Sequence, residues 1–171
     1  CEVLNLKDIS FDRCLRPKNA VAFPILIVFC DGSDDAFGTC AYIRWKLVDG
    51  SFITKLIMAK SRVTPIKVVT IVRSELGGAT LGRRISETLK SGCRFQFERR
   101  YFIVDSEIVR SMVHKESYGF NTYVAVRIRE IQSTTNPEEW YWVESKENIA
   151  DWTTRPKSPC ELGSGSLWQT G

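Results

Sequence analysis

The sequence predicts an α/β domain built on a mixed five-stranded sheet, with helices on both faces of the sheet. Two short apolar runs that each end in an aspartate predict neighbouring central strands. Three strand patterns in succession precede the first helical pattern, which favours antiparallel pairing at the start of the sheet. Later alternation of helix and strand supplies the other two strands. The expected order is therefore β-β-β-α-β-α-α-β-α, without internal repeats.

Length and composition are those of one globular domain. The chain has 171 residues and a net charge of +4, so it can bury a core and its charge permits a polyanionic partner. No apolar run approaches the roughly 20 residues that span a bilayer, so we expect no membrane partner. The six cysteines show no C-x-x-C pairing and the one histidine is His114. This usage argues against structural zinc and favours reduced intracellular thiols.

We expect three segments along the chain. Residues 1–22 are a lead-in attached to a preceding domain, 23–157 form the domain, and 158–171 are a C-terminal tail. No secretory signal is visible and the first residue is Cys1 rather than Met, so the chain looks like a piece of a longer polypeptide. The Gly-Ser-rich stretch from Gly163 is expected to be loosely ordered, apart from Leu167 and Trp168.

The first three strands are predicted from apolar runs and a turn signal. Residues 25–30 are β-branched, aromatic and uncharged and then break at Asp31, which predicts a buried strand over about 24–31. A second strand pattern covers 37–45. Asp49 and Gly50 predict a tight hairpin with a primed turn, and a third strand follows over about 51–60.

The first helix is expected over about 73–89, after a loop at 61–70. Its core stripe is Gly78, Leu81, Ile85 and Leu89. Gly77, Gly78 and Gly82 each cost a helix about 1 kcal/mol relative to Ala. Their presence predicts that this helix lies very close to the sheet or to a ligand. Glu75, expected in the first turn, would then point toward the end of the first strand.

The C-terminal half is predicted to hold two strands and three helices. A strand over 100–105 ends at Asp105, and 140–143 form a fifth, aromatic strand. One helix is expected from Ser106 and another from about Thr122. Their expected buried residues are Ile108, Val109, Met112 and Val113 in the first and Val124, Ile128 and Ile131 in the second. Asn148 would cap a final short helix that carries Asp151 and that Pro156 ends.

Four acids have defined places in this scheme. Asp31 and Asp105 end the first and fourth strands, which would be neighbours at the centre of the sheet, and Glu75 and Asp151 lie on flanking helices. Carboxylates at close quarters repel one another unless cations compensate them, and oxygen donors without His or Cys suit Mg²⁺ or Mn²⁺. Two such ions about 4 Å apart support in-line attack of water on a phosphodiester. We therefore interpret the four acids as metal-binding and catalytic.

Several local motifs share a resemblance to one family. They are DRCL at 12–15, FCDGSDDAFG at 29–38, AKSRVTP at 59–65, RSEL at 73–76, VDS at 104–106, VESKENIAD at 143–151 and SLWQ at 166–169. In its D…E…D…D order the chain resembles the ribonuclease H superfamily. More narrowly, it resembles the ribonuclease H domain of BEL/Pao-type LTR retrotransposon polyproteins.

The resemblance implies a ribonuclease H-like fold and hydrolysis of the RNA strand of RNA/DNA hybrids during reverse transcription, with two Mg²⁺ ions for which Mn²⁺ can substitute. Asp31 would bridge both ions, and Asp151 would hold the ion that activates water. Glu75 and Asp105 would hold the ion at the leaving 3′ oxygen, with Glu75 near the RNA 2′-hydroxyl. Many cellular relatives have a histidine in the loop before the last acid, where this chain has ESK at 144–146.

The same resemblance implies partners and a location. Contacts to the nucleic-acid backbone are expected from Ser33, Lys60, Arg62, Arg73 and Ser106. The polymerase domain of the same polyprotein would be the protein partner. The expected location is intracellular, in cytoplasmic virus-like particles, with the nucleus as a second compartment. The sequence does not indicate an oligomeric state.

Two alternative functions remain open. The domain could be a catalytically silent nucleic-acid-binding or spacer module of a reverse transcriptase. It could also be an integrase or transposase core with Asp31, Asp105 and Glu147 as its triad, although that reading leaves Glu75 and Asp151 unexplained. Trp140 and Trp142 are interpreted as alternating strand residues, one of them in the core, rather than as a base-stacking platform.

Overall fold

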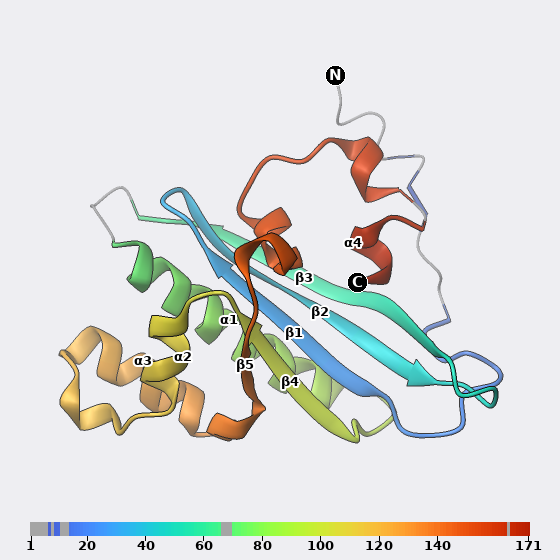
Figure 1. Cartoon of the computed structure of the whole chain (residues 1–171), viewed down its shortest axis with the longest axis horizontal. Coiled ribbons are helices and arrows are strands. Elements are labelled where there is room, and N and C mark those ends of the chain that lie inside the picture. Colours follow the sequence, from blue (N-terminus) through green and yellow to red (C-terminus); the bar gives the residue numbers. More distant parts are fainter. Residues whose placement is uncertain (1–6, 8, 11–13, 66–69, 164) are drawn as a thin grey trace.

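The structure is a computed structural model that describes residues 7, 9–10, 14–65, 70–163 and 165–171. Parts of the expected lead-in and of the loop before the first helix lie outside these ranges. A five-stranded sheet with the order β3-β2-β1-β4-β5 forms the centre (Figure 1). Its strands are β1 (Ile25–Gly32), β2 (Ala36–Lys46), β3 (Phe52–Val63), β4 (Arg99–Val104) and β5 (Trp140–Trp142).

The sheet is mixed, as the sequence predicts. β1, β2 and β3 pair antiparallel, whereas β4 pairs parallel with β1 and β5 pairs parallel with β4. The α-helices are α1 (Ile71–Gly92), α2 (Glu107–Val113), α3 (Thr122–Gln132) and α4 (Leu167–Thr170). Short 3₁₀ helices are η2 (Ser117–Gly119), η3 (Pro137–Glu139), η4 (Ser145–Glu147), η5 (Ile149–Thr153) and η6 (Pro159–Leu162).

Both faces of the sheet are covered, because successive side chains of a strand point to opposite sides. Leu26, Val28 and Cys30 of β1 belong to the main core, which the helices α1, α2 and α3 complete. Phe29 packs in a second cluster on the other face, together with residues of η5 and with Trp168 of α4. In Figure 1, α1 lies behind the sheet while η5 and α4 lie in front of it.

The glycines of α1 allow this helix to contact β1 directly. A Cβ atom on Gly78 would lie 2.3 Å from the main-chain oxygen of Asp31, and one on Gly82 would lie 2.3 Å from the sulfur of Cys30. On the strand side, a Cβ on Gly32 would lie 2.2 Å from the main-chain nitrogen of Glu75. The predicted close approach of helix and sheet is confirmed, and it occurs beside two of the four acids.

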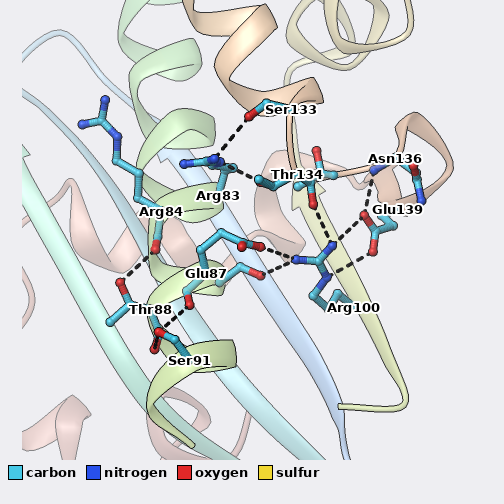
Figure 2. A network of polar contacts seen from close by, with 12 residues as sticks. Arg83, Arg84, Glu87, Thr88, Ser91, Arg100, Ser133, Thr134, Asn136 and Glu139 are labelled. Atoms are coloured by element: carbon cyan, nitrogen blue, oxygen red, sulfur yellow. Dashed lines mark hydrogen bonds and ion pairs between the residues drawn. The ribbon is translucent and has the colours of Figure 1, made fainter. Parts of the chain in front are cut away.

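A network of polar contacts fixes the opposite end of α1 to β4 and η3 (Figure 2). Arg100 is the central residue, and its side chain is only 14% exposed. Its guanidinium lies 2.7 Å from Glu87 and 3.2 Å from Glu139, and it also donates to the main-chain oxygen of Thr134 at 2.9 Å. Because its charge is paired and hydrogen-bonded, this partly buried arginine is compatible with the core.

Some boundaries differ from the prediction. α1 begins at Ile71, so Glu75 lies in its second turn rather than its first. β3 continues to Val63, beyond the expected end at 60. Ile108 is 54% exposed instead of buried, because Val109 and Val113, spaced by four residues, are the α2 positions that face the core. The other residues expected in the cores of α2 and α3 are buried or partly buried.

The turn between β2 and β3 is a hairpin, but it is not a tight primed turn. Gly50 has a φ of 83°, whereas no described non-glycine residue, Asp49 included, has positive φ. A type I′ turn requires positive φ at both central residues. Here Gly50 donates to Leu47, and the amide and hydroxyl of Ser51 donate to the Asp49 carboxylate. The loop is therefore longer than the Asp-Gly signal predicted.

The C-terminal tail contacts the domain through Trp168, one of the two residues that the expectation of loose order from Gly163 excepted. Trp168 stacks on Trp152 with ring centroids 6.1 Å apart, and the Tyr42 hydroxyl donates to the Trp168 main chain at 2.8 Å. Among the described residues, the thiols of Cys14, Cys30, Cys40 and Cys93 are free. Within the described ranges, no helix combines the length and apolar character that crossing a bilayer requires.

Candidate active site

Asp31 and Asp105 come together through the parallel pairing of β1 and β4. The register places Cys30 of β1 beside Val104 of β4. Asp31 follows Cys30 and Asp105 follows Val104, so the two aspartates leave the parallel strands at the same level. Asp31 is still paired with Gly38 of β2 and is only 7% exposed. Asp105 follows the last residue of β4 directly. The two predicted strand-end acids therefore lie side by side at the carboxyl ends of the neighbouring strands β1 and β4.

Glu75 reaches this edge from α1. The bare Gly32 lets the helix backbone at Ser74 and Glu75 approach the end of β1. Ser106, the first residue after Asp105, hydrogen-bonds to the Glu75 carboxylate, and its hydroxyl also caps α2 by accepting from the Val109 amide. The third predicted acid is thus positioned by both of the neighbouring elements.

Asp151 lies on η5, across the other face of β1. Asn148 caps this short helix, as predicted, by accepting from the Ala150 amide at 3.2 Å. Its side-chain amide also donates to the main-chain oxygen of Cys30 at 3.0 Å. On the other side of Asp151, the Thr154 hydroxyl donates to the carboxylate of Asp31. These contacts bring the fourth predicted acid to the same edge, on a 3₁₀ rather than an α-helix.

The four carboxylates influence one another electrostatically. Burial raises the pKa of the Asp31 carboxyl; the hydrogen bond from Thr154 opposes this, and the charges of Asp105 and Asp151 raise the pKa further. Burial likewise raises the pKa of Glu75, with the Ser106 hydrogen bond opposing and the charges of Asp105 and Asp31 adding to the rise. Both acids therefore carry a cost for being ionised that a nearby cation would remove.

The chemistry of the donors fits a hard divalent cation, but they do not form a compact preformed centre. Among the described residues, no three His, Cys, Asp or Glu side chains are spaced closely enough to hold a metal ion together. The neighbouring thiol is not a competing ligand, because burial raises the pKa of Cys30 to about 12. Asp151 also forms an ion pair with Arg155 at 2.7 Å. The structure thus brings the four carboxylates to one edge of the sheet, but their oxygen atoms do not surround a single metal position.

The predicted nucleic-acid contacts have different surroundings. Lys60 and Arg62 are exposed on β3. The Ser33 hydroxyl accepts from the amides of Asp35 and Ala36 and so closes the turn after β1. Ser106 is 8% exposed and its hydroxyl serves Glu75 and α2. Arg73 lies over the ring of Tyr123, 4.9 Å from its centroid. These five contacts remain predictions.

A cavity lined by basic and aromatic residues was missed by the sequence reasoning. Its volume is about 130 Å³. Its lining includes three arginines and two aromatic residues, Arg62, Arg84, Arg127, Phe37 and Tyr123. The Arg127 guanidinium lies 3.4 Å from the Tyr123 ring centroid. Its residues come from β2, β3, α1 and α3, so only the clustering of basic residues in the middle of the chain could have hinted at it.

A family model described as a Pao retrotransposon-like RNaseH-like domain matches residues 1–106, which is more than half of the chain. The chain belongs to this family. The matched span of this RNaseH-like domain includes Asp31, Glu75 and Asp105 and ends before Asp151. The resemblance stated from the sequence is confirmed, and the mixed sheet with strand order β3-β2-β1-β4-β5 is the ribonuclease H-like fold that it implied.

Solved structures that resemble the RNaseH-like domain are ribonucleases H of low sequence identity. The N-terminal RNase H domain of rv2228c from Mycobacterium tuberculosis is 14% identical, with 73% of this chain and 86% of that chain covered and a TM-score of 0.44. RNase H1 from Halobacterium salinarum is 11% identical, with 74% and 89% covered and a TM-score of 0.41. LC11-RNase H1, solved with an RNA/DNA hybrid, is 11% identical, with 74% and 88% covered and a TM-score of 0.41. No curated protein matches the chain.

Proposed function

We propose that this domain hydrolyses the RNA strand of RNA/DNA hybrids, with divalent metal held by Asp31, Glu75, Asp105 and Asp151. One observation carries the proposal: these acids come from four different elements to one edge of the sheet, and Asp31 and Glu75 respond to the charges of the others. Membership of an RNaseH-like family supports the same class of reaction. Mg²⁺ is the proposed ion, and Mn²⁺ is expected to substitute for it.

The electrostatic couplings support a division of the four acids around Asp31. Asp31 responds to both Asp105 and Asp151, whereas Glu75 responds to Asp105 and Asp31. Asp31 is thus the acid that the two groups share, with Glu75 and Asp105 on the α1 side and Asp151 on the η5 side. Two bound divalent ions would supply an activated water and charge stabilisation at the leaving oxygen. The contribution of the protein is to hold these donors in fixed positions on β1, β4, α1 and η5.

The basic cavity supports binding of a polyanionic substrate by this domain. Gly77, two residues after Glu75, lines the same cavity as Arg62 and Arg127. Guanidinium groups bind phosphate through several N–H donors, and an aromatic ring such as Tyr123 limits where they can point. Contacts with phosphates position a substrate, while the 2′-hydroxyl distinguishes RNA from DNA. We propose that this cavity holds backbone phosphate of the hybrid while the acids act on the RNA strand.

We also propose that the domain works beside the polymerase domain of a retrotransposon polyprotein. That neighbour would hold the hybrid while this domain cuts the RNA strand, so a chain tested alone is expected to bind its substrate more weakly. The test should therefore include the chain with and without the polymerase domain attached.

The decisive experiment is a cleavage assay with labelled RNA/DNA hybrid, duplex RNA and duplex DNA, in Mg²⁺, Mn²⁺ or EDTA. We expect cleavage of RNA in the hybrid only, and only with added metal. Asp31→Asn and Asp105→Asn should each abolish cleavage while the protein stays folded. Asp34→Asn is the matched control, because Asp34 is exposed in the turn three residues after Asp31. All variants are purified by the same procedure, so that loss of cleavage in Asp31→Asn and Asp105→Asn shows that the activity does not come from a contaminating nuclease.

Each alternative function has its own outcome in this assay. Binding of the hybrid without cleavage would identify a silent module, and cleavage with joining of duplex DNA would identify an integrase. The integrase triad is disfavoured by position, because Glu147 is exposed on η4 whereas Asp151 is the late acid that acts on Asp31. Retained cleavage in Asp31→Asn or Asp105→Asn would overturn the proposal.

A further inference from the structure

Two side chains hold η5 against β1, one on each side of Asp151. Asn148 precedes Asp151 by three residues and donates to the main-chain oxygen of Cys30 at 3.0 Å. Thr154 follows Asp151 by three residues and donates to the carboxylate of Asp31 itself. The first contact fixes the backbone of η5, whereas the second reaches one of the proposed catalytic side chains directly.

The Thr154 hydroxyl contacts both the carboxylate of Asp31 and the main chain of Asp151. Its oxygen is 3.2 Å from the main-chain oxygen of Asp151 as well as in contact with Asp31 Oδ2. A hydroxyl has one proton, and an ionised carboxylate is the stronger acceptor, so the proton belongs mainly to the bond with Asp31. The contact is therefore a direct link between the side chain of Asp31 and the turn that carries Asp151.

The backbone around Thr154 is restricted by its neighbour. Thr153 packs against the bare backbone of Gly38 on β2, where an added Cβ would lie 2.0 Å from the Thr153 hydroxyl oxygen. The Thr153 hydroxyl also donates to the main chain of Ala150 at 2.7 Å. The end of η5 is thus held against the sheet independently of Thr154, which leaves the Thr154 hydroxyl free to act on Asp31 rather than to maintain the turn.

We propose that Thr154 is a positioning residue that sets the orientation of the Asp31 carboxylate relative to Asp151, so that both can bind one divalent cation. The inference rests on the metal-binding role in the proposed function. Carboxylates that bind metals are held by hydrogen-bond donors around them, and loss of such a donor typically weakens metal binding or activity 10–100-fold. Asp31, buried and shared between the two groups of acids, is the ligand for which a fixed orientation matters most.

The test compares Thr154→Val, which removes the hydroxyl and keeps the shape, with Thr154→Ser, which keeps the hydroxyl. Thr88→Val is the matched control, because its hydroxyl donates to the main chain of Arg84 on an exposed turn of α1. Mn²⁺ binding to the metal-free full chain is measured by calorimetric titration, and circular dichroism checks the fold. Hybrid cleavage is measured separately on the same samples.

We expect Thr154→Val to bind Mn²⁺ about 10–100-fold more weakly than the unmodified protein. Thr154→Ser should recover most of that loss, and Thr88→Val should show none. Equal Mn²⁺ affinity in Thr154→Val and the unmodified protein would overturn the inference, even where hybrid cleavage is observed. Mn²⁺ binding that depends on the Thr154 hydroxyl in a protein that does not cleave hybrid would support the inference and overturn the proposed activity. If Thr154→Val does not fold, the Mn²⁺ affinity of Thr154→Ser decides. An affinity that matches the unmodified protein supports the inference, whereas an affinity as weak as that of Asp31→Asn overturns it.

Discussion

The indole of Trp142 donates a hydrogen bond to the main-chain oxygen of Asp105 at 2.9 Å. This bond joins the last residue of β5 to the bend that carries one of the four acids. The main-chain amide of Val143 donates to Val104 just before that bend. The edge strand β5 therefore fixes the direction in which the chain leaves β4, and with it the position of Asp105.

Trp142→Phe should affect both stability and the site, because it retains an aromatic ring but removes the donor to Asp105. We expect the free energy of unfolding to fall by about 1 kcal/mol, the typical worth of one neutral hydrogen bond. Hybrid cleavage should fall as the Asp105 bend gains freedom. Urea unfolding and initial cleavage rates measure the two effects. Tyr141→Phe is the control, since Tyr141 is the exposed neighbour in the same strand, and equal effects in both variants would contradict the role given to Trp142.

Gly78→Ala should disturb the contact between α1 and β1. The new Cβ would lie 2.3 Å from the Asp31 main-chain oxygen, so the helix must move away from the strand. Overpacking of this kind costs about 1–3 kcal/mol of stability. The same movement would carry Glu75 away from Asp31 and lower the cleavage rate.

Gly92→Ala is the matched control for that substitution. No atom lies within 4 Å of an added Cβ at Gly92, which ends the same helix. Alanine at a compatible position reduces the entropy of the unfolded chain and stabilises by about 0.4–1 kcal/mol. Thermal and urea unfolding of both variants would reveal opposite signs; a Gly78→Ala protein as stable as the unmodified one would show that α1 is not held against β1.

Asp31→Asn should stabilise the metal-free protein at neutral pH. The folded-state pKa of Asp31 is raised, so its contribution to stability is present below the unfolded-state pKa and is lost as the pH rises through the folded-state pKa. Replacing the carboxylate by an amide removes that loss. The advantage of the variant should therefore shrink as the solution is acidified.

Mg²⁺ should reverse the order of stability, because a ligand that binds only the folded state adds to its stability and the variant lacks a metal ligand. Urea midpoints across a pH series, in EDTA and then in Mg²⁺, measure both effects. Asp34→Asn serves as the exposed control. If Asp31→Asn and the unmodified protein unfold at the same urea concentration at neutral pH in EDTA, the buried charge of Asp31 carries no cost.

Arg127→Met should weaken binding of the hybrid without changing the cleavage of saturated enzyme. Arg127 lines the basic cavity over Tyr123, and none of the four acids lines that cavity. Loss of one phosphate contact should lower the slope of log affinity against log salt by about 1. Arg129→Met is the control on the same helix, since Arg129 is exposed and does not line the cavity. Equal salt slopes for Arg127→Met and the unmodified protein would show that the cavity does not bind phosphate of the hybrid.

The features that the sequence could predict are those recorded in local patterns. Asp31 and Asp105 were placed correctly because each ends an apolar strand. The helix glycines, which are costly in a helix, predicted a close approach of the helix to the sheet or to a ligand. The position of Glu75 was predicted less well, since the start of α1 depends on contacts with β1 rather than on a capping residue: Thr70 provides no side-chain cap.

The features that the sequence could not predict depend on contacts between distant segments. The cavity combines Arg62 of β3 with Tyr123 and Arg127 of α3, and no local pattern connects them. Thr154 meets Asp31 across a separation of 123 residues. Ile108 was misplaced because two neighbouring positions of a short helix differ by about 100° in direction, and only the packed structure selects which one faces inward.

The contact between Asp31 and Thr154 also bears on when the domain matures during translation. Asp31 is synthesised well before its hydrogen-bonding partner Thr154 and before Asp151, because 123 residues separate Asp31 from Thr154. A nascent or prematurely terminated polypeptide therefore carries three of the four acids without the segment that completes them. Such unfinished products would be unable to assemble the site of four acids.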